Sequence, residues 1–280
     1  MFFSFWPHRS EFSTNRKDLL TDLIAGLTVA IVALPLAIGF GITSGMSAAA
    51  GLTTAIIAGF LGAIFGGSKY QVSGPTGAMT VILIPVIHNY GVGAIPALGL
   101  LAGVMVIAMA VFKLGAVINR VPWTVIEGFT VGIALIISLQ QIPLALGIVK
   151  GDGEKSYIVA WNTLKDALNA GLNYSSLLVV LITLIIKFVW PQLVHRLKWK
   201  LHIPASFIAL LLVSLLVKAF SIDVATIGNI PRALGSYQKP IFENLTALLI
   251  PALWIALLAA VESLLSARVA DGLAHNKVHF

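Results

Sequence analysis

The sequence predicts an all-α membrane protein that crosses the bilayer several times. Of the 280 residues, 58% are hydrophobic and only 10% are charged, whereas a soluble domain averages about 25% charged residues. The charges gather between long apolar stretches, which is the pattern that a bilayer imposes. These stretches are continuous and do not alternate with polar residues, so helices are favoured over the strands of a β-barrel.

Eight apolar segments follow one another, and most reach the roughly 20 residues that a spanning helix needs. We place them at 23–42, 48–66, 74–90, 93–112, 123–147, 174–194, 203–220 and 245–267. The third is short and follows a β-like stretch at 69–73. We therefore expect a short strand and a half-helix there in place of a full crossing. Polar loops are expected at 149–171 and 221–244.

The positions of the lysines and arginines predict the orientation of the chain in the membrane. With the N-terminus in the cytoplasm, 12 of the 18 fall on the cytoplasmic side, as the positive-inside rule requires. Residues 1–18 are then a cytoplasmic segment, and 221–244 is an extracytoplasmic loop. The net charge of +7 is explained by this topology, so we expect no nucleic-acid partner. The expected location is a bacterial inner (plasma) membrane.

The third segment carries the chemistry at its start. Ser73 is predicted to cap the helix, and Pro75 suits its first turn. A helix that begins inside a membrane directs free N–H groups and a positive dipole end at a buried point, which makes an anion site. The alternative is an ordinary loop punctuated by Gly-Pro. The predicted substrate-binding residues here are Ser73, Gly74, Pro75, Thr76, Gly77 and Ala78.

Glu262 lies deep in the eighth segment. A carboxylate in an apolar span is energetically expensive and is a functional candidate by default. We predict that Glu262 has a functional role and could carry a proton at neutral pH. The alternatives are a structural glutamate bonded to a neighbouring helix, or a partner of Arg268. Arg268 lies six residues after Glu262 and therefore on another face of the helix.

Other chemistries find no support in the sequence. The chain has no cysteine, and its His, Asp and Glu residues show no metal-ligand spacing, so we expect neither a metal, nor a cofactor, nor an enzyme. Residues 32–46 align weakly with 259–273 and set Pro35 against Glu262. The two stretches lie in the first and the eighth segment, so each repeat would comprise seven segments, and this odd number would make the repeats inverted in topology.

Three stretches resemble the SulP family, which is solute carrier 26 in animals. They are DLIAGLTVAIVALPLAIGFGITSGM, GGSKYQVSGPTGAMTVIL and ESLLSARVADG, and the similarity runs from Lys17 to Asp271. The resemblance implies fourteen segments in two inverted seven-segment repeats, a cytoplasmic STAS domain, a homodimer, and anion substrates such as sulfate, bicarbonate and dicarboxylates. It also implies a core bundle (segments one to four and eight) that moves against a gate (five to seven).

The resemblance also implies roles for single residues. The third and tenth half-helices of the family point their N-termini at the anion, and the first span lines the site here with Pro35, Leu36 and Ala37. Some members carry an acidic or amide residue where this chain has Leu36. Glu262, with Ser266 one turn later, therefore becomes the better candidate for coupling to a proton or a sodium ion.

The expected domains are therefore residues 19–220 as the first repeat, and 245–280 as the eighth segment with a truncated C-terminus. Segments nine to fourteen and the STAS domain are expected to be absent. Two alternatives stay open. One is an inactive or split-protein fragment that needs a second chain. The other is a nucleobase-type carrier on the same fold, which the Ser-Gly-Pro-Thr-Gly block argues against.

Overall fold

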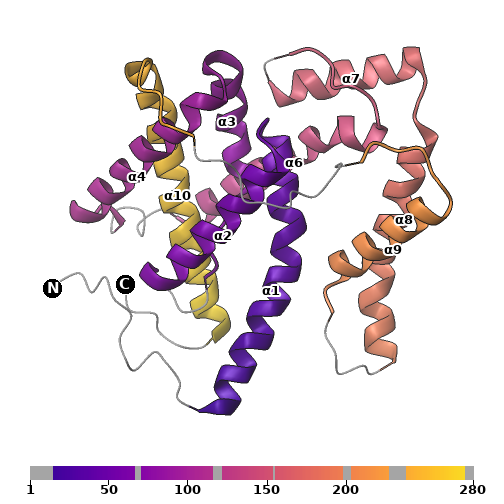
Figure 1. The fold of residues 1–280 in the computed structure, drawn as a ribbon, viewed down its shortest axis with the longest axis horizontal. Coiled ribbons are helices and arrows are strands. Elements are labelled where there is room, and N and C mark those ends of the chain that lie inside the picture. Colours follow the sequence, from indigo (N-terminus) through magenta and orange to yellow (C-terminus); the bar gives the residue numbers. More distant parts are fainter. Residues whose placement is uncertain are drawn as a thin grey trace. The chain divides into compact units, whose positions relative to one another are not determined.

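The computed structural model describes residues 15–66, 71–115, 122–153, 155–197, 203–226 and 238–274. Every regular element in these ranges is a helix (Figure 1), which confirms the predicted all-α class. Most of the N-terminal segment, part of the 221–244 loop, Lys69 and the end of the chain lie outside the described residues.

Helices occupy all eight predicted apolar segments. They are α1 (Arg16–Thr43), α2 (Ala48–Phe65), α3 (Gly77–Tyr90), α4 (Ile95–Val111), α6 (Trp123–Leu146), α8 (Tyr174–Arg196), α9 (Ala205–Ala219) and α10 (Leu245–Ala274). A short 3-10 helix, η2 (Val92–Ala94), precedes α4. Five of the described helices are long and apolar enough to cross a membrane. The chain is therefore a multi-pass membrane protein, and the number of eight segments stays a prediction.

The strand predicted at 69–73 is wrong for its described part. Residues 71–76 are extended but irregular. A strand exists only through hydrogen bonds to a neighbouring strand, and the described residues offer none. The third segment is therefore an extended lead followed by a short helix.

The predicted loop at 149–171 is also different, because most of it is a helix, α7 (Ser156–Ala170). Its composition is polar enough to exclude a spanning segment, which led to the loop prediction. The apolar residues nevertheless recur at helical spacing, as in Tyr157, Trp161, Leu164 and Leu168, and such a pattern forms a helix on a surface.

The chain forms two compact units. The first contains Leu36–Ile133 and Pro231–Phe280, and the second contains Ser13–Pro35 and Ala134–Ile230. The boundary passes through α1 between Pro35 and Leu36, and through α6 after Ile133.

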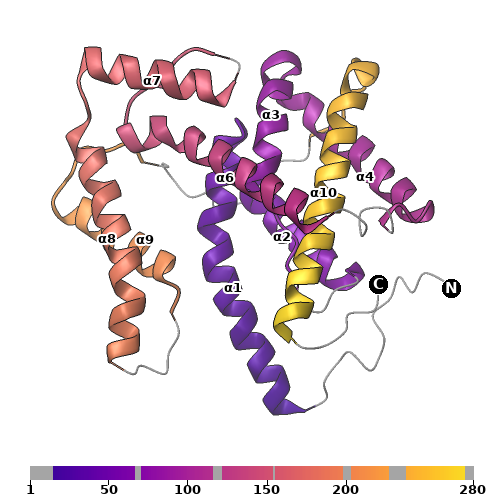
Figure 2. The ribbon, with the colours of Figure 1, turned by 180° about the vertical axis from the view of Figure 1, so that it is seen from behind.

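The core of the first unit lies where α3, α4 and α10 pack together, and Figure 2 shows α10 crossing α4. Small side chains dominate it, and Ala97 and Ala252 are completely buried. Small residues let membrane helices approach closely. The core residues are Val86, Ala94, Ala97, Leu98, Ala102, Leu248 and Ala252.

Glycines hold the end of α1 against α2. A Cβ atom added to Gly41 would lie 2.6 Å from the Ser47 carbonyl oxygen and 2.9 Å from the Gly51 Cα. Gly51 in turn faces the Ala37 carbonyl oxygen. Only glycine fits at this crossing, because backbone atoms cannot move aside as a flexible side chain does.

We therefore expect Gly41→Ala to lower stability by about 1–3 kcal/mol, as overpacking does. Gly39→Ala in the same helix is the control, since a Cβ there meets nothing within 4 Å. Replacing a helical glycine at such an open site is neutral or slightly stabilising. Thermal unfolding in detergent measures both variants, and equal melting temperatures would contradict the packing described.

Candidate functional site

The helix α3 begins later than predicted. Thr76 is its N-cap residue, with φ −119° and ψ 149°, and the first helical residue is Gly77. The predictions that Ser73 caps the helix and that Pro75 lies in its first turn are therefore wrong. Ser73 packs against α2 instead, where a Cβ on Gly62 would lie 2.5 Å from Ser73 Oγ.

The start of α3 has no side-chain cap. The first N–H groups of any helix have no acceptor within the helix, and Thr76 supplies none here. Gly77 and Ala78 are buried, so bulk water does not readily replace the missing cap. With fourteen residues α3 is about 21 Å long, too short to cross the roughly 30 Å hydrocarbon core. Its uncapped end therefore offers backbone donors and a positive dipole end to a buried anion.

Glu262 of α10 meets this helix start. Its half-buried side chain lies close enough to Thr76 to interact with the hydroxyl. The two are not in hydrogen-bond geometry, and within the described part of the chain Thr76 Oγ1 is a buried oxygen that makes no hydrogen bond. A buried hydroxyl without a partner costs free energy. The site thus holds an uncapped helix end, a buried hydroxyl and a carboxylate together.

A second polar contact joins the same two segments. Gln71 Nε2 donates a hydrogen bond of 3.1 Å to Ser263 Oγ. Neither residue was among the predicted site residues. Their positions in the sequence could have identified them as site residues, because Gln71 comes shortly before the Ser-Gly-Pro-Thr-Gly block and Ser263 follows Glu262.

The other predicted site residues differ from one another in burial and in the compact unit to which they belong. Ala37 is 1% exposed and lies against α2, whereas the side chain of Leu36 is 49% exposed. Pro35 belongs to the second compact unit. Ser266 is exposed one turn after Glu262, and Ser73 and Gly74 are also exposed.

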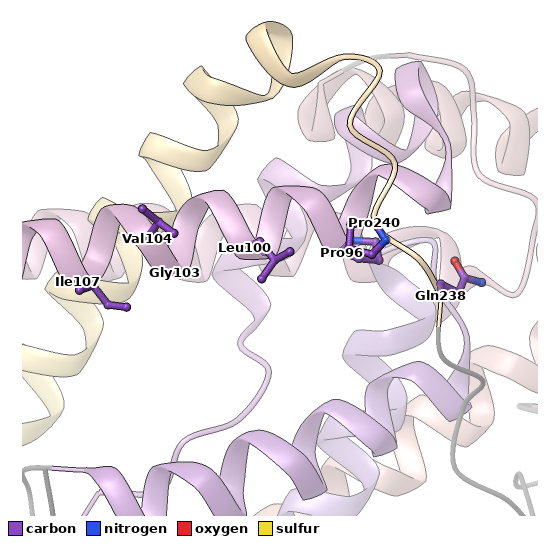
Figure 3. A pocket seen from close by; sticks show the side chains of 8 residues that line it. Pro96, Leu100, Gly103, Val104, Ile107, Gln238 and Pro240 are labelled. Carbon is purple, nitrogen blue, oxygen red and sulfur yellow. The ribbon is translucent and has the colours of Figure 1, made fainter.

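One cavity of the described residues lies away from the start of α3. It is a groove of about 570 Å³ along α4, and Figure 3 shows the residues that line it. They are Pro96, Gly99, Leu100, Gly103, Val104, Ile107, Gln238 and Pro240. The lining is almost wholly apolar and includes none of the predicted site residues, and the amide of Gln238 is the one side-chain donor among its lining residues. No group of His, Asp or Glu that could hold a metal occurs in the described ranges either.

The sequence of this chain is similar to those of known transport proteins. Residues 19–280 match the sulfate permease family. The putative sulfate transporter YvdB of Bacillus subtilis is 37% identical over 270 residues, covering 94% of this chain and 50% of YvdB. The bicarbonate transporter BicA of Synechocystis is 34% identical over 271 residues, which are 92% of this chain and 46% of BicA.

Solved structures agree with the fold. The transmembrane domain of a cyanobacterial bicarbonate transporter BicA superposes with a TM-score of 0.80 at 32% identity, covering 98% of this chain and 69% of that chain. The murine Slc26a9 anion transporter in its inward-facing state gives a TM-score of 0.83 at 16% identity, covering 99% and 50%. The second likeness concerns the fold alone.

The chain belongs to the sulfate permease family, SulP or solute carrier 26. The family and the relatives named above are transporters and not enzymes, which confirms both the resemblance and the expected absence of an enzymatic role. The chain spans about half the length of the curated relatives it matches.

Because the Thr76 hydroxyl makes no hydrogen bond with the described residues, we expect Thr76 and Thr80 to respond differently to replacement by valine. Thr76→Val should keep or raise the melting temperature without added anion, because it removes a buried polar atom that has no partner. Thr80→Val is the matched control. Thr80 is 2% exposed and its Oγ1 donates to the Gly77 carbonyl oxygen at 2.6 Å, so this variant should lose about 1 kcal/mol. An equal loss in both variants would contradict the geometry described for Thr76.

Proposed function

We propose that this chain forms part of a secondary active transporter of small anions of the sulfate, bicarbonate or dicarboxylate class. The anion binds at the start of α3, on backbone N–H groups within Ser73–Ala78, with Pro35, Leu36 and Ala37 on the neighbouring wall. The uncapped, buried beginning of α3 is the observation that carries this proposal. Membership of the sulfate permease family supports the class of substrate.

The carboxylate of Glu262 explains why such a site needs a coupling ion. An anion bound at α3 would share the region around Thr76 with Glu262. Two like charges about 4 Å apart repel by on the order of 4 kcal/mol at an effective dielectric constant of about 20. A proton or a sodium ion on Glu262 removes this repulsion, so cation and anion bind together. Ser266, one turn away, is the expected second ligand.

The two compact units suggest how access alternates. The first unit contains α2, α3, α4 and α10, and the second contains α7, α8 and α9. This division resembles the expected core of segments one to four and eight and the expected gate of five to seven, except that α1 up to Pro35 belongs to the second unit and α6 up to Ile133 to the first. In the proposed mechanism the first unit carries the bound anion and moves as one body, since α3, α4 and α10 share a continuous core.

This chain covers 50% of YvdB and 46% of BicA. Transport is therefore to be tested with this chain alone and with a second chain that supplies the other half. A homodimer, a bacterial inner membrane and a cytoplasmic N-terminus belong to the same proposal. The alternative is a fragment that is inactive by itself.

Uptake of labelled sulfate, bicarbonate and dicarboxylate into proteoliposomes tests the function. The chain is assayed alone and after co-expression with a chain that supplies the second half. We expect saturable uptake of one anion class, with restoration by the second chain if the first is silent. Absence of uptake of every anion under both conditions would overturn the proposal.

The coupling role of Glu262 predicts a specific defect. Uptake by Glu262→Gln should no longer respond to an imposed proton or sodium gradient, because an amide carries no charge to neutralise. Glu243→Gln is the control, since Glu243 is an exposed carboxylate before α10 begins. Gradient-driven uptake that survives in Glu262→Gln would assign the coupling to another group.

A further inference from the structure

The helix α7, at Ser156–Ala170, has one face that is fixed against the protein. Ala160, Thr163 and Ala167 are at most 2% exposed, and at about 100° per residue they share one narrow stripe. The Gly151 amide donates to Thr163 Oγ1 at 2.8 Å, and Asn162 Nδ2 donates to the Asp152 carbonyl oxygen at 2.8 Å. These contacts set the rotation of α7 about its own axis.

A second face of α7 is apolar and uncovered. Tyr157, Trp161, Leu164 and Leu168 follow one another at intervals of three and four residues and fall within an arc of about 60°. Trp161 is 60% exposed and Leu168 is 80% exposed. Large apolar side chains in one continuous stripe mark an interaction surface.

The third face is polar and begins beside the aromatic stripe. Asn162, Lys165, Asp166 and Asn169 lie on it. The Lys165 ammonium sits 5.6 Å from the centre of the Trp161 ring, so the positive charge borders the apolar face directly. An apolar stripe with aromatic residues and an adjacent lysine is the composition of helices that lie in a membrane interface.

The chain places α7 at the membrane surface. Only residues 171–173 separate it from α8 (Figure 1), which is long and apolar enough to span the bilayer. Three residues reach at most about 10 Å. Gly171, with φ +95°, permits the sharp change of direction, and Asn173 caps α8 by accepting from the Ser176 amide at 3.1 Å. The end of α7 therefore lies where α8 enters the bilayer.

We propose that α7 lies in the headgroup layer of the membrane that α8 crosses, with Tyr157, Trp161, Leu164 and Leu168 inserted at the acyl boundary and Lys165 paired with the phosphate of an anionic phospholipid. With fifteen residues α7 is about 22 Å long, too short and too polar to cross. The lipid surface is the occupant that its tether to α8, its aromatic residues and its positive charge all favour.

The test uses the absence of native cysteine, because a single introduced cysteine carries a nitroxide label without background. Leu168→Cys reports on the apolar stripe, and its neighbour Asn169→Cys reports on the polar face. In proteoliposomes the Leu168 label should collide with oxygen and not with a water-soluble nickel chelate, at a depth of about 5–10 Å. The Asn169 label should show the reverse. A label at Leu181, exposed on α8, confirms that the protein is inserted.

Each other outcome overturns the proposal. A Leu168 label that collides with the nickel chelate as freely as the Asn169 label means that α7 stands in water. A Leu168 label that neither reagent reaches means that a protein surface, such as a second copy, covers the stripe. Lys165→Gln should make the depth of the Leu168 label independent of phosphatidylglycerol in the vesicles, and an unchanged lipid dependence would remove the assigned ion pair.

Discussion

The first amides of α3 are the constraint around which the first unit is arranged. In a membrane every backbone N–H needs an acceptor, because lipid supplies none. The residues at this helix start are buried and Thr76 provides no cap, and in the proposed function a bound anion accepts hydrogen bonds from these amides. The surroundings fix the helix start in place. Ser73 packs on Gly62 of α2, the glycines of α1 and α2 meet closely, and α10 packs along α3 and α4.

The same helix start brings an electrostatic conflict into the site. Backbone donors attract an anion, while Glu262 beside Thr76 repels it. Anion binding that did not depend on Glu262 would not couple transport to a second gradient. In the proposed mechanism the two groups together make anion affinity depend on whether Glu262 holds a cation. Thermodynamic linkage then requires that the anion strengthens cation binding by the same factor.

The sequence predicted the large features because they depend on composition and length. Each of the eight apolar runs predicted a helix that the structure contains, and the short third run predicted the short α3. The features that were not predicted depend on contacts with distant residues. A strand at 71–73 needs a neighbouring strand. Ser73 packs on Gly62 and does not cap α3, and α7 is held by hydrogen bonds with Gly151 and Asp152. Glu262 was identified because a carboxylate stands out in an apolar run, whereas Gln71 and Ser263 gained meaning only from their contact.

The most direct measurement is the position of a bound anion. Selenate has the shape and charge of sulfate, and its selenium atom scatters anomalously, so an anomalous difference map of selenate-soaked crystals locates it without assumptions about the site. We predict a peak within hydrogen-bond distance of the Gly77 and Ala78 amide nitrogens, next to Thr76 and Glu262. Bound selenate at another place, with the start of α3 empty, would contradict the assignment of the anion site.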